Sequence, residues 1–436
     1  MNDIKVSVIV PVYNPGESIV KCIHSLQNQT LKEIEMIFVD DCGTDGAMDI
    51  VKEAAKNDTR IHFLINMRNI GSGPSRNRGI DAAKGEYLSF IDPDDYVSED
   101  FMEKLYKKGK STDADISKGE VIKVIDGIIK AEKLTFNEVI RRGITEGRDL
   151  CFLFTYNHVA ALYRRNWIIK SGARYGESNN AEDTTFLLRV CYGDPALTFV
   201  DTAYYYYVAR HGSADSSFSK DTMKGHIISF REKIEFLTSH DCDSSEMHSY
   251  ITRTIQRLLK TQSGYALIPD MGDAAADFLV ELREYINSFP FAKYLGEKNR
   301  TIDVFLKYGF NITLDPFGSE WNRANFKDYY DVVSRVVNFI CSYPELETEY
   351  GDYLRYAFEQ AITHQDGKTL NERRRARTAL LQQVQRIPHR DILTKDFVAM
   401  KLYIDFGVDL FGLRNTKTGK NIKGYLRKIR TIKSKR

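Results

Sequence analysis

Short apolar runs alternate with amphipathic stretches along the first hundred positions of the chain. Residues 6–14 open with a β-branched run of the length that a fully buried strand needs, and Pro11 and a polar turn end it. Residues 17–29 then place apolar side chains on one face of a helix. The same alternation predicts, in order, strand 34–39, helix 47–56, strand 61–64, helix 75–83 and a strand that ends at Asp92.

This β-α-β-α order predicts an α/β fold with a mostly parallel sheet and helices on both faces. In such sheets ligands collect at the carboxyl ends of the strands. Asp41 and Asp92 each follow a predicted strand, so we expect both at that edge.

Three carboxylates crowd the end of the last of these strands, at Asp92, Asp94 and Asp95. Like charges so close together repel one another unless a cation or solvent compensates them, and hard oxygen ligands suit Mg²⁺ or Mn²⁺. The alternative is that these aspartates cap the helix that follows. Ser98 is already a suitable N-cap residue, so a cap needs few of them.

With these pieces in place, the sequence resembles the family 2 glycosyltransferases, which are inverting, sugar-nucleotide-dependent enzymes with the A-type glycosyltransferase fold. The resemblance rests on five segments in the family's order: V-S-V-I-V-P-V-Y-N (6–14), V-D-D-C-G-T-D-G (39–46), G-P-S-R-N-R-G-I (73–80), G-E-Y-L-S-F-I-D-P-D-D (85–95) and A-E-D-T-T-F (181–186). It implies transfer of a sugar from a nucleotide donor to an acceptor hydroxyl.

The resemblance also implies roles for the first acidic residues. Asp94 would ligate Mn²⁺ or Mg²⁺ directly, Asp92 would lie nearer the donor ribose or sugar at the same metal site, and Asp95 would support them. Asp41 matches the aspartate that accepts the N–H of a uracil ring. The alternative for Asp41 is an Asx turn after its strand, although Asp45 suits that turn better.

Further donor contacts follow from the same resemblance. Pro11, Val12 and Tyr13 would wall the nucleotide, with Tyr13 near the base, although Tyr13 could equally be a core residue. Arg76 lies in a glycine-rich segment that permits close backbone approach, and its guanidinium can meet phosphate oxygens.

The pair Glu182-Asp183 precedes an apolar-periodic helix, so an acidic helix N-terminus is one interpretation. The resemblance instead makes Asp183 the catalytic base and Glu182 an acceptor-positioning residue, and we expect Glu182 to raise the pKa of Asp183. Trp167 could form the floor of an acceptor-sugar site, or it could anchor a helix through apolar packing.

A strand is predicted at 203–208, followed by small and polar residues up to 217. In the family this place is a lid over the donor phosphates. Arg210 and His211 are candidates to reach the diphosphate, and His211 also the metal. A lone histidine in a loop is otherwise a solvated one.

Helical patterns dominate after about residue 216, and the resemblance ends near residue 217. We therefore predict a catalytic domain at 1–217, a helical extension at 218–310, a C-terminal helical domain at 311–413 and a basic amphipathic tail at 414–436. The helical region is where oligomerisation would occur.

Composition changes the picture in two ways. The six cysteines show no metal-binding spacing, and no stretch approaches 18 uninterrupted apolar residues. We therefore expect reduced thiols in a cytoplasmic protein without a signal peptide or membrane span. The net charge of +2 hides a tail, residues 414–436, with ten Lys or Arg and no acid.

Apolar residues recur at helical spacing within that tail, which favours peripheral contact with an anionic membrane on the inner face of the plasma membrane. A disordered basic tail and nucleic-acid binding are the alternatives; we predict no nucleic-acid partner. The sequence as a whole predicts a metal-dependent transferase that moves a sugar from a UDP-sugar to a glycan or lipid-linked acceptor. A sugar-phosphate nucleotidyltransferase and a non-catalytic glycan-binding or scaffolding protein are the other classes.

Overall fold

The computed structural model describes residues 4–129, 157–178, 181–209, 220–240, 245–265, 272–289 and 299–309, together with short pieces between 292 and 386. Contacts divide the chain into two units, Met1–Leu258 and Leu259–Arg436. The domain boundaries that the sequence suggested stay predictions.

A mixed sheet forms the centre of the first unit. Its strands follow the order β3-β2-β1-β4-β8-β6-β9-β5, and β7 pairs with β6. Their bounds are β1 Val6–Val12, β2 Ile34–Asp40, β3 Ile61–Ile65, β4 Tyr87–Phe90, β5 Tyr96–Val97, β6 Ile116–Ile125, β7 Ile128–Ile129, β8 Ala161–Arg164 and β9 Leu197–Ala209.

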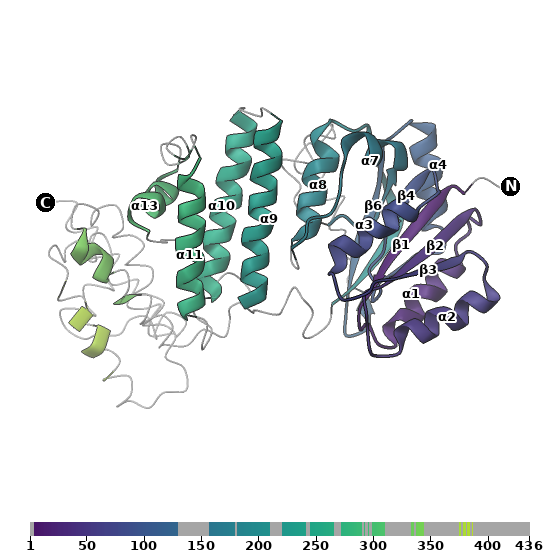
Figure 1. Ribbon diagram of the computed structural model, residues 1–436, viewed down its shortest axis with the longest axis horizontal. Helices are drawn as coiled ribbons and strands as arrows, with labels where there is room; N and C mark the ends of the chain where they lie inside the picture. Colours follow the sequence, from purple (N-terminus) through teal and green to yellow (C-terminus); the bar gives the residue numbers. More distant parts are fainter. Residues whose placement is uncertain are drawn as a thin grey trace, which may run out of the picture. The chain divides into compact units, whose positions relative to one another are not determined.

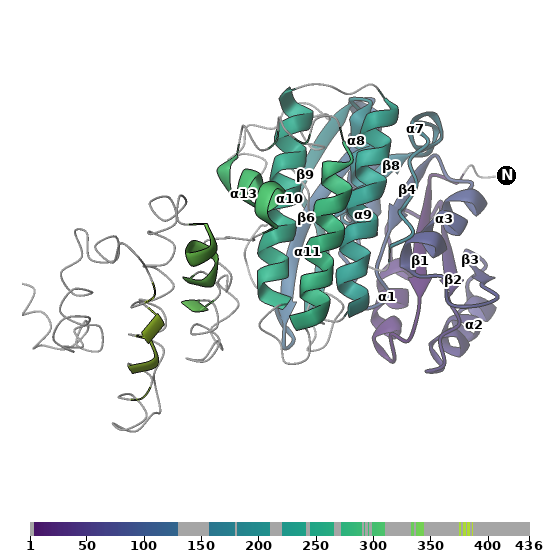
Figure 2. The same cartoon turned by 60° about the vertical axis from the view of Figure 1, so that its left-hand side comes forward.

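The first four strands are parallel, as the alternation predicted. Beyond β4 the sheet is mixed, because β8 lies antiparallel to both β4 and β6, whereas β6 and β9 are parallel (Figure 2). The α/β fold with a mostly parallel sheet is confirmed.

Helices cover both faces of this sheet (Figure 1). The helices of the first unit's sheet region are α1 Ser18–Gln27, α2 Ala47–Asn57, α3 Ser72–Ala82, α4 Phe101–Ser111, α7 Arg165–Ser171 and α8 Glu182–Tyr192. The even-numbered side chains of β1 pack with α1, α2 and α4 in one apolar cluster. The Ile9 side chain points to the other face of the sheet, against Gly79 of α3. A Cβ atom at position 79 would collide with the Ile9 side chain. Strand alternation thus gives β1 two buried faces.

The helix-cap interpretation of the acidic run is wrong. The short strand β5 separates Asp95 from α4, which begins only at Phe101. Ser98 is not the N-cap either, since Asp100 occupies that position and receives the Ser98 hydroxyl hydrogen bond at 3.0 Å.

The described residues after 209 form helices and no strand. These helices are α9 Lys220–Ser239, α10 Ser245–Tyr265, α11 Gly272–Asn287 and α13 Arg300–Tyr308. Within the second unit, Arg283 of α11 ties down the end of α13 by donating to the carbonyl of Leu306 at 2.8 Å. Among the helices of the described ranges, none combines the length and apolarity that crossing a bilayer requires.

Candidate active site

The carboxyl ends of β1, β2 and β4 bring the predicted acids to one edge of the sheet. Val12 pairs with Asp40, and the amide of Asp41 donates to the carbonyl of Val12 at 2.9 Å. The amide of Ile91, just before Asp92, donates to the carbonyl of Ile9 at 3.1 Å. Parallel register therefore places Asp41 and Asp92 on neighbouring loops, as expected.

Asp41 is buried and holds the loop between β3 and α3. Its Oδ1 accepts from the Asn66 side chain at 2.7 Å and from the Ile70 amide at 2.8 Å. Its Oδ2 accepts from the Gly71 amide at 2.8 Å. The Asx turn belongs to Asp45, whose Oδ1 accepts from the Ala47 amide at 3.1 Å. A uracil contact by Asp41 stays a prediction, and it would use the second lone pair of Oδ2.

The predicted nucleotide wall divides into buried and exposed parts. Pro11 and Val12 lie inside β1 and are buried. Tyr13, the next residue, is 53% exposed, so the core alternative for Tyr13 is wrong. Its ring is free to stack on a planar ligand at the end of β1.

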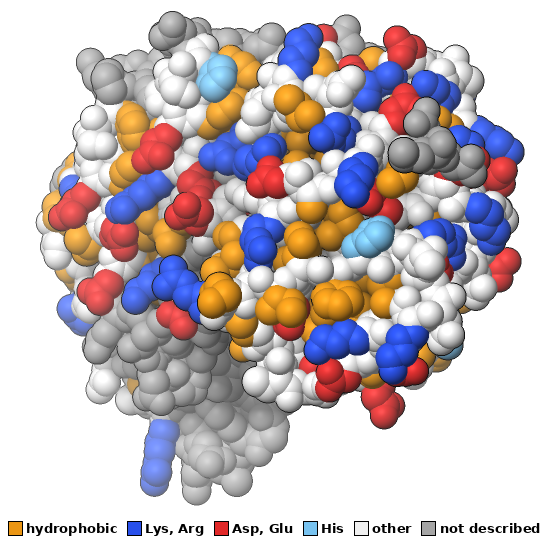
Figure 3. All heavy atoms as spheres, turned by 45° about the vertical axis from the view of Figure 1, so that its right-hand side comes forward, with side chains coloured by type: hydrophobic (Ala, Val, Ile, Leu, Met, Phe, Trp, Pro, Cys, Tyr) orange, Lys and Arg blue, Asp and Glu red, His pale blue; other side chains and the backbone are white. Residues whose placement is uncertain are grey.

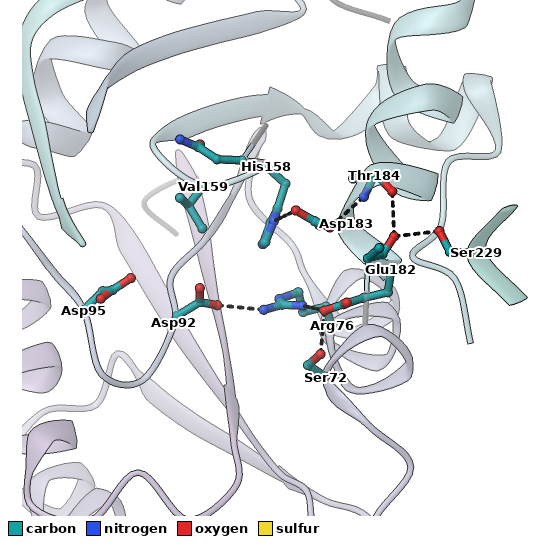
Figure 4. Close-up of polar contacts among 12 residues, drawn as sticks. Ser72, Arg76, Asp92, Asp95, His158, Val159, Glu182, Asp183, Thr184 and Ser229 are labelled. Atoms are coloured by element: carbon teal, nitrogen blue, oxygen red, sulfur yellow. Dashed lines mark hydrogen bonds and ion pairs between the residues drawn. The ribbon is translucent and has the colours of Figure 1, made fainter. Parts of the chain in front are cut away.

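Arg76 links the β4 loop to the start of α8 (Figure 4). The guanidinium donates from one terminal nitrogen to Asp92 at 2.7 Å and from the other to Glu182 at 2.8 Å. Glu182 also accepts from the Ser72 hydroxyl at 2.6 Å. Burial alone would lower the pKa of Arg76, but the charges of Asp92 and Glu182 raise it well above its ordinary value. Both terminal nitrogens thus meet carboxylates, and phosphate contact by Arg76 stays a prediction.

Close packing at Gly73 makes this bridge possible. A Cβ at Gly73 would collide with the carbonyl oxygen of Gly176 and press on the Glu182 side chain. The glycine therefore lets the first turn of α3 approach the start of α8, which is the close backbone approach that the glycine-rich segment suggested.

Asp95 is held beneath the acidic loop by β9. It accepts from the Tyr205 hydroxyl at 2.6 Å and from the Val208 amide at 2.8 Å. Burial, together with the negative charge of Asp92, raises the pKa of Asp95 to about 8. Without a bound cation, this shift favours the protonated form of Asp95 more than in a free carboxyl group.

The remaining carboxylates, Asp92 and Asp94, fit a hard divalent cation. Both side chains are partly exposed at the same loop. Within the described ranges no group of three or more His, Cys, Asp or Glu has the geometry of a metal site. Mg²⁺ is commonly held by one or two carboxylates, with water and substrate phosphates completing the shell, so two protein oxygens suffice.

Asp183 lies in the first turn of α8 and is paired with a histidine. Its Oδ2 is 3.7 Å from Nδ1 of His158, and its Oδ1 accepts from the Thr184 amide at 2.8 Å. Burial raises the pKa of Asp183, but His158 and the charges of Arg76 and Lys233 outweigh burial and lower it overall. The expectation that Glu182 raises this pKa is wrong, because Arg76 compensates the charge of Glu182.

Glu182 and Asp183 both lie in the first turn of α8, as the acidic N-terminus interpretation predicted, although neither side chain caps the helix. The N-cap residue is Ala181, with φ of 62° and no side-chain cap. Trp167 donates its indole N–H to the carbonyl of Val190 at 2.8 Å, which joins α7 to α8 and favours the anchoring interpretation.

Some predicted residues fall outside the described ranges. Arg210, His211 and the tail 414–436 are among them. Their assigned roles stay predictions. Conversely, sequence analysis missed His158, because a single histidine between Asn157 and Val159 carries no spacing signal.

Comparison with known proteins agrees with this geometry. Residues 7–172 match the model of Glycosyl transferase family 2. EpsH of Bacillus subtilis is 28% identical over 261 residues, covering 54% of this chain and 70% of EpsH. The poly(ribitol-phosphate) beta-glucosyltransferase of Bacillus spizizenii is 37% identical over 126 residues, which are 28% of this chain but only 20% of that enzyme.

Solved structures show the same fold. The crystal structure of S. aureus TarS 1–349 in complex with UDP-GlcNAc matches with a TM-score of 0.53 and 21% identity, over 70% of this chain and 92% of that one. Residues 7–172 thus form a glycosyl transferase family 2 segment, and the fold around them is the A-type glycosyltransferase fold. The protein is therefore a glycosyltransferase, and neither the nucleotidyltransferase nor the non-catalytic alternative is supported.

Proposed function

We propose that this enzyme transfers a sugar, with inversion, from a UDP-sugar to a hydroxyl group of a glycan or lipid-linked acceptor in cell-surface polymer synthesis. One observation carries the proposal. Arg76 bonds Asp92 at the end of β4 and Glu182 at the start of α8, so the donor side and the acceptor side of the reaction share one buried cation. The UDP-GlcNAc in the TarS complex and the poly(ribitol-phosphate) acceptor in the Bacillus spizizenii enzyme's name support the substrate classes.

The reaction assigns Asp183 the proton. The acceptor oxygen forms a bond to the anomeric carbon, the bond from that carbon to the diphosphate breaks, and the acceptor proton passes to the Asp183 carboxylate. The lowered pKa keeps this carboxylate ionised and ready at neutral pH. Glu182, fixed by Ser72 and Arg76, orients the first turn of α8.

The leaving diphosphate gains negative charge as the bond breaks. Asp94 and Asp92 would hold the Mn²⁺ or Mg²⁺ that compensates this charge, with His211 as a further candidate. Tyr13 offers its exposed ring to the base and Asp41 an acceptor to the uracil N–H. UDP should therefore bind more tightly than CDP or GDP when Mn²⁺ is present.

A donor panel tests the proposal. Purified enzyme is offered UDP-, GDP- and CDP-sugars with Mn²⁺ and then with a chelator, and released nucleotide and the anomeric configuration of the product are measured. We expect the enzyme to release UDP from one UDP-sugar and to lose this activity in chelator. The product should have the anomeric configuration opposite to that of the donor. Equal use of GDP-sugars would contradict the assignment of Asp41, and retention of configuration would contradict the role of Asp183.

The basic tail supports a place for the enzyme beside a lipid-linked acceptor. Deleting residues 414–436 should leave hydrolysis of the soluble donor unchanged and reduce co-sedimentation with anionic vesicles. Salt should weaken that binding, since the Debye length is about 8 Å at physiological ionic strength. If the full chain does not bind such vesicles at low salt, the proposed peripheral attachment through the tail is wrong.

A further inference from the structure

His158 is a buried imidazole at the candidate active site. It is 5% exposed, and among the described residues neither ring nitrogen has a hydrogen-bond partner within normal distance. Its Nδ1 faces Oδ2 of Asp183 at 3.7 Å (Figure 4). A buried histidine that served packing alone would have its ring N–H satisfied elsewhere. The geometry leaves Asp183 as the group toward which this ring is directed.

The backbone on both sides of His158 is braced. The ammonium group of Lys118 in β6 donates to the carbonyl and side-chain oxygens of Asn157 at 2.8 and 2.9 Å and to the carbonyl of Val159 at 2.5 Å. The Tyr163 hydroxyl donates to the carbonyl of His158 itself at 2.7 Å. All three N–H groups of the Lys118 ammonium thus donate to Asn157 and Val159, the two residues that flank His158.

This bracing holds an unusual backbone. Asn157 and Ala160 both have left-handed φ angles, 65° and 55°. A side chain beyond Cα disfavours this region, and such conformations persist only where surrounding contacts impose them; they occur preferentially at functional sites. Contacts from the rest of the fold therefore hold residues 157–160 in backbone conformations that they would not adopt by themselves. These conformations direct the His158 ring toward Asp183.

Two aromatic rings, those of Tyr175 and Phe90, pack against the imidazole of His158. Its centroid lies 5.2 Å from that of Tyr175, edge to face, and 6.1 Å from that of Phe90. Tyr175 in turn stacks on Phe186 of α8 at 4.2 Å. This packing restricts rotation of the imidazole and leaves little room for a water molecule to hydrogen-bond with its nitrogens.

We infer that His158 is a positioning residue for Asp183: its Nδ1–H donates to Oδ2 in the complex with acceptor and fixes the carboxylate for proton transfer. The inference rests on the proposed function. A gap of 3.7 Å is compatible with it, because catalytic hydrogen bonds are often long in free enzymes and shorten in the substrate complex. Only the acceptor proton moves, to Asp183, and His158 keeps its own.

Two substitutions separate hydrogen bonding from packing. His158→Leu fills the aromatic cage without a donor, whereas His158→Asn keeps an N–H close to the position of Nδ1. We expect His158→Leu to lower kcat about 10- to 100-fold with the donor KM unchanged, and His158→Asn to recover most of the loss. His24→Asn, on the exposed face of α1, is the control and should match the parent enzyme.

A double-mutant cycle completes the test. In an Asp183→Asn background, His158→Leu should reduce the residual turnover no further, because its effect passes through the carboxylate. UDP affinity and thermal unfolding report whether each variant is folded. Equal losses in the Leu and Asn variants, or additive losses in the cycle, would overturn the role of His158. If Asp183→Asn itself keeps full turnover, the proposed base is wrong instead.

Discussion

Two acids on opposite sides of Arg76 show how differently one site treats the same side chain. Asp95 lies in the loop after β4, where burial and the neighbouring charge of Asp92 raise its pKa to about 8. Asp183 lies in the first turn of α8, where burial is outweighed by His158 and by the charges of Arg76 and Lys233, and its pKa is lowered. Burial raises the pKa of both acids, so the groups that surround each carboxyl determine whether its pKa ends above or below the ordinary value.

The contrast has a chemical consequence. Pairs of titratable groups whose surroundings separate their pKa values are the usual source of distinct roles in an active site. Here the lowered pKa favours the ionised form of Asp183, as the proposed base requires, while the raised pKa favours the protonated form of Asp95. The proposed cation site therefore relies on Asp92 and Asp94, the partly exposed carboxylates of this loop.

Removing the predicted metal ligand should have the largest effect. Asp94→Ala takes away the carboxylate that would hold the cation at the leaving diphosphate, so transfer should become undetectable. Isothermal titration with UDP should lose its Mn²⁺ dependence, while thermal unfolding stays unchanged. Asp49→Ala, an exposed position on α2, is the matched control. Metal-dependent transfer in the Asp94 variant would remove the metal assignment.

The other side of the comparison is tested at the base. Asp183→Asn preserves shape but cannot take the acceptor proton, so turnover should fall by a factor on the order of 10² to 10⁴. Donor affinity should survive, because the substitution leaves Asp92 and Asp94 untouched. Single-turnover kinetics alongside UDP titration separate the two. Near-normal turnover would leave Asp183 with a structural role only.

Arg76 joins the two regions, so its loss should destabilise both. Arg76→Met leaves Asp92 and Glu182 without their shared cation, and we expect the free energy of unfolding to fall by about 3 kcal/mol. Arg76→Lys should recover only part of the lost free energy of unfolding, since one ammonium group cannot bridge both acids as a guanidinium does. Urea denaturation measures this. Lys52→Met, which breaks an exposed pair with Asp49, should cost under about 0.5 kcal/mol. An equal, small cost at both positions would contradict the bridge.

The pH dependence of stability tests the other acid of the comparison, Asp95. Its folded-state pKa of about 8 lies above the ordinary value of 3.8, so the folded state binds the extra proton between these values. Stability from this group is complete at low pH and declines as pH rises toward 8, by at most about 1.4 kcal/mol per pH unit. In chelator, Asp95→Asn should flatten this decline between pH 5 and 8. An unchanged slope in that variant would mean that Asp95 is ionised in the folded state.

The face of the molecule drawn in Figure 3 is mixed in character. This face carries Lys, Arg, Asp and Glu side chains interspersed with apolar ones (Figure 3). Exposed apolar side chains of the first unit include those at the edge of the sheet, Phe63, Ile65 and Met67. Exposed apolar side chains are normal on protein surfaces, and no contact among the described residues assigns a function to this short row.

The sequence alone determined the parallel half of the fold. Hydrophobic runs and helical periods are local signals, so β1 to β4 and their helices lie within a few residues of the predicted ranges. Because parallel strands end at one edge, the same signals also placed Asp41 and Asp92 together.

Only the tertiary structure decided the rest. The strand β6 contains Lys118 and Gly119 in an interrupted apolar pattern, and its pairing with β8 and β9 depends on contacts between distant segments. The Arg76–Glu182 bridge spans 106 positions of the chain. The signs of the Asp95 and Asp183 pKa shifts follow from neighbours that such folding brings in. Sequence specifies which groups can ionise, whereas the three-dimensional arrangement of charge and burial determines which of them do.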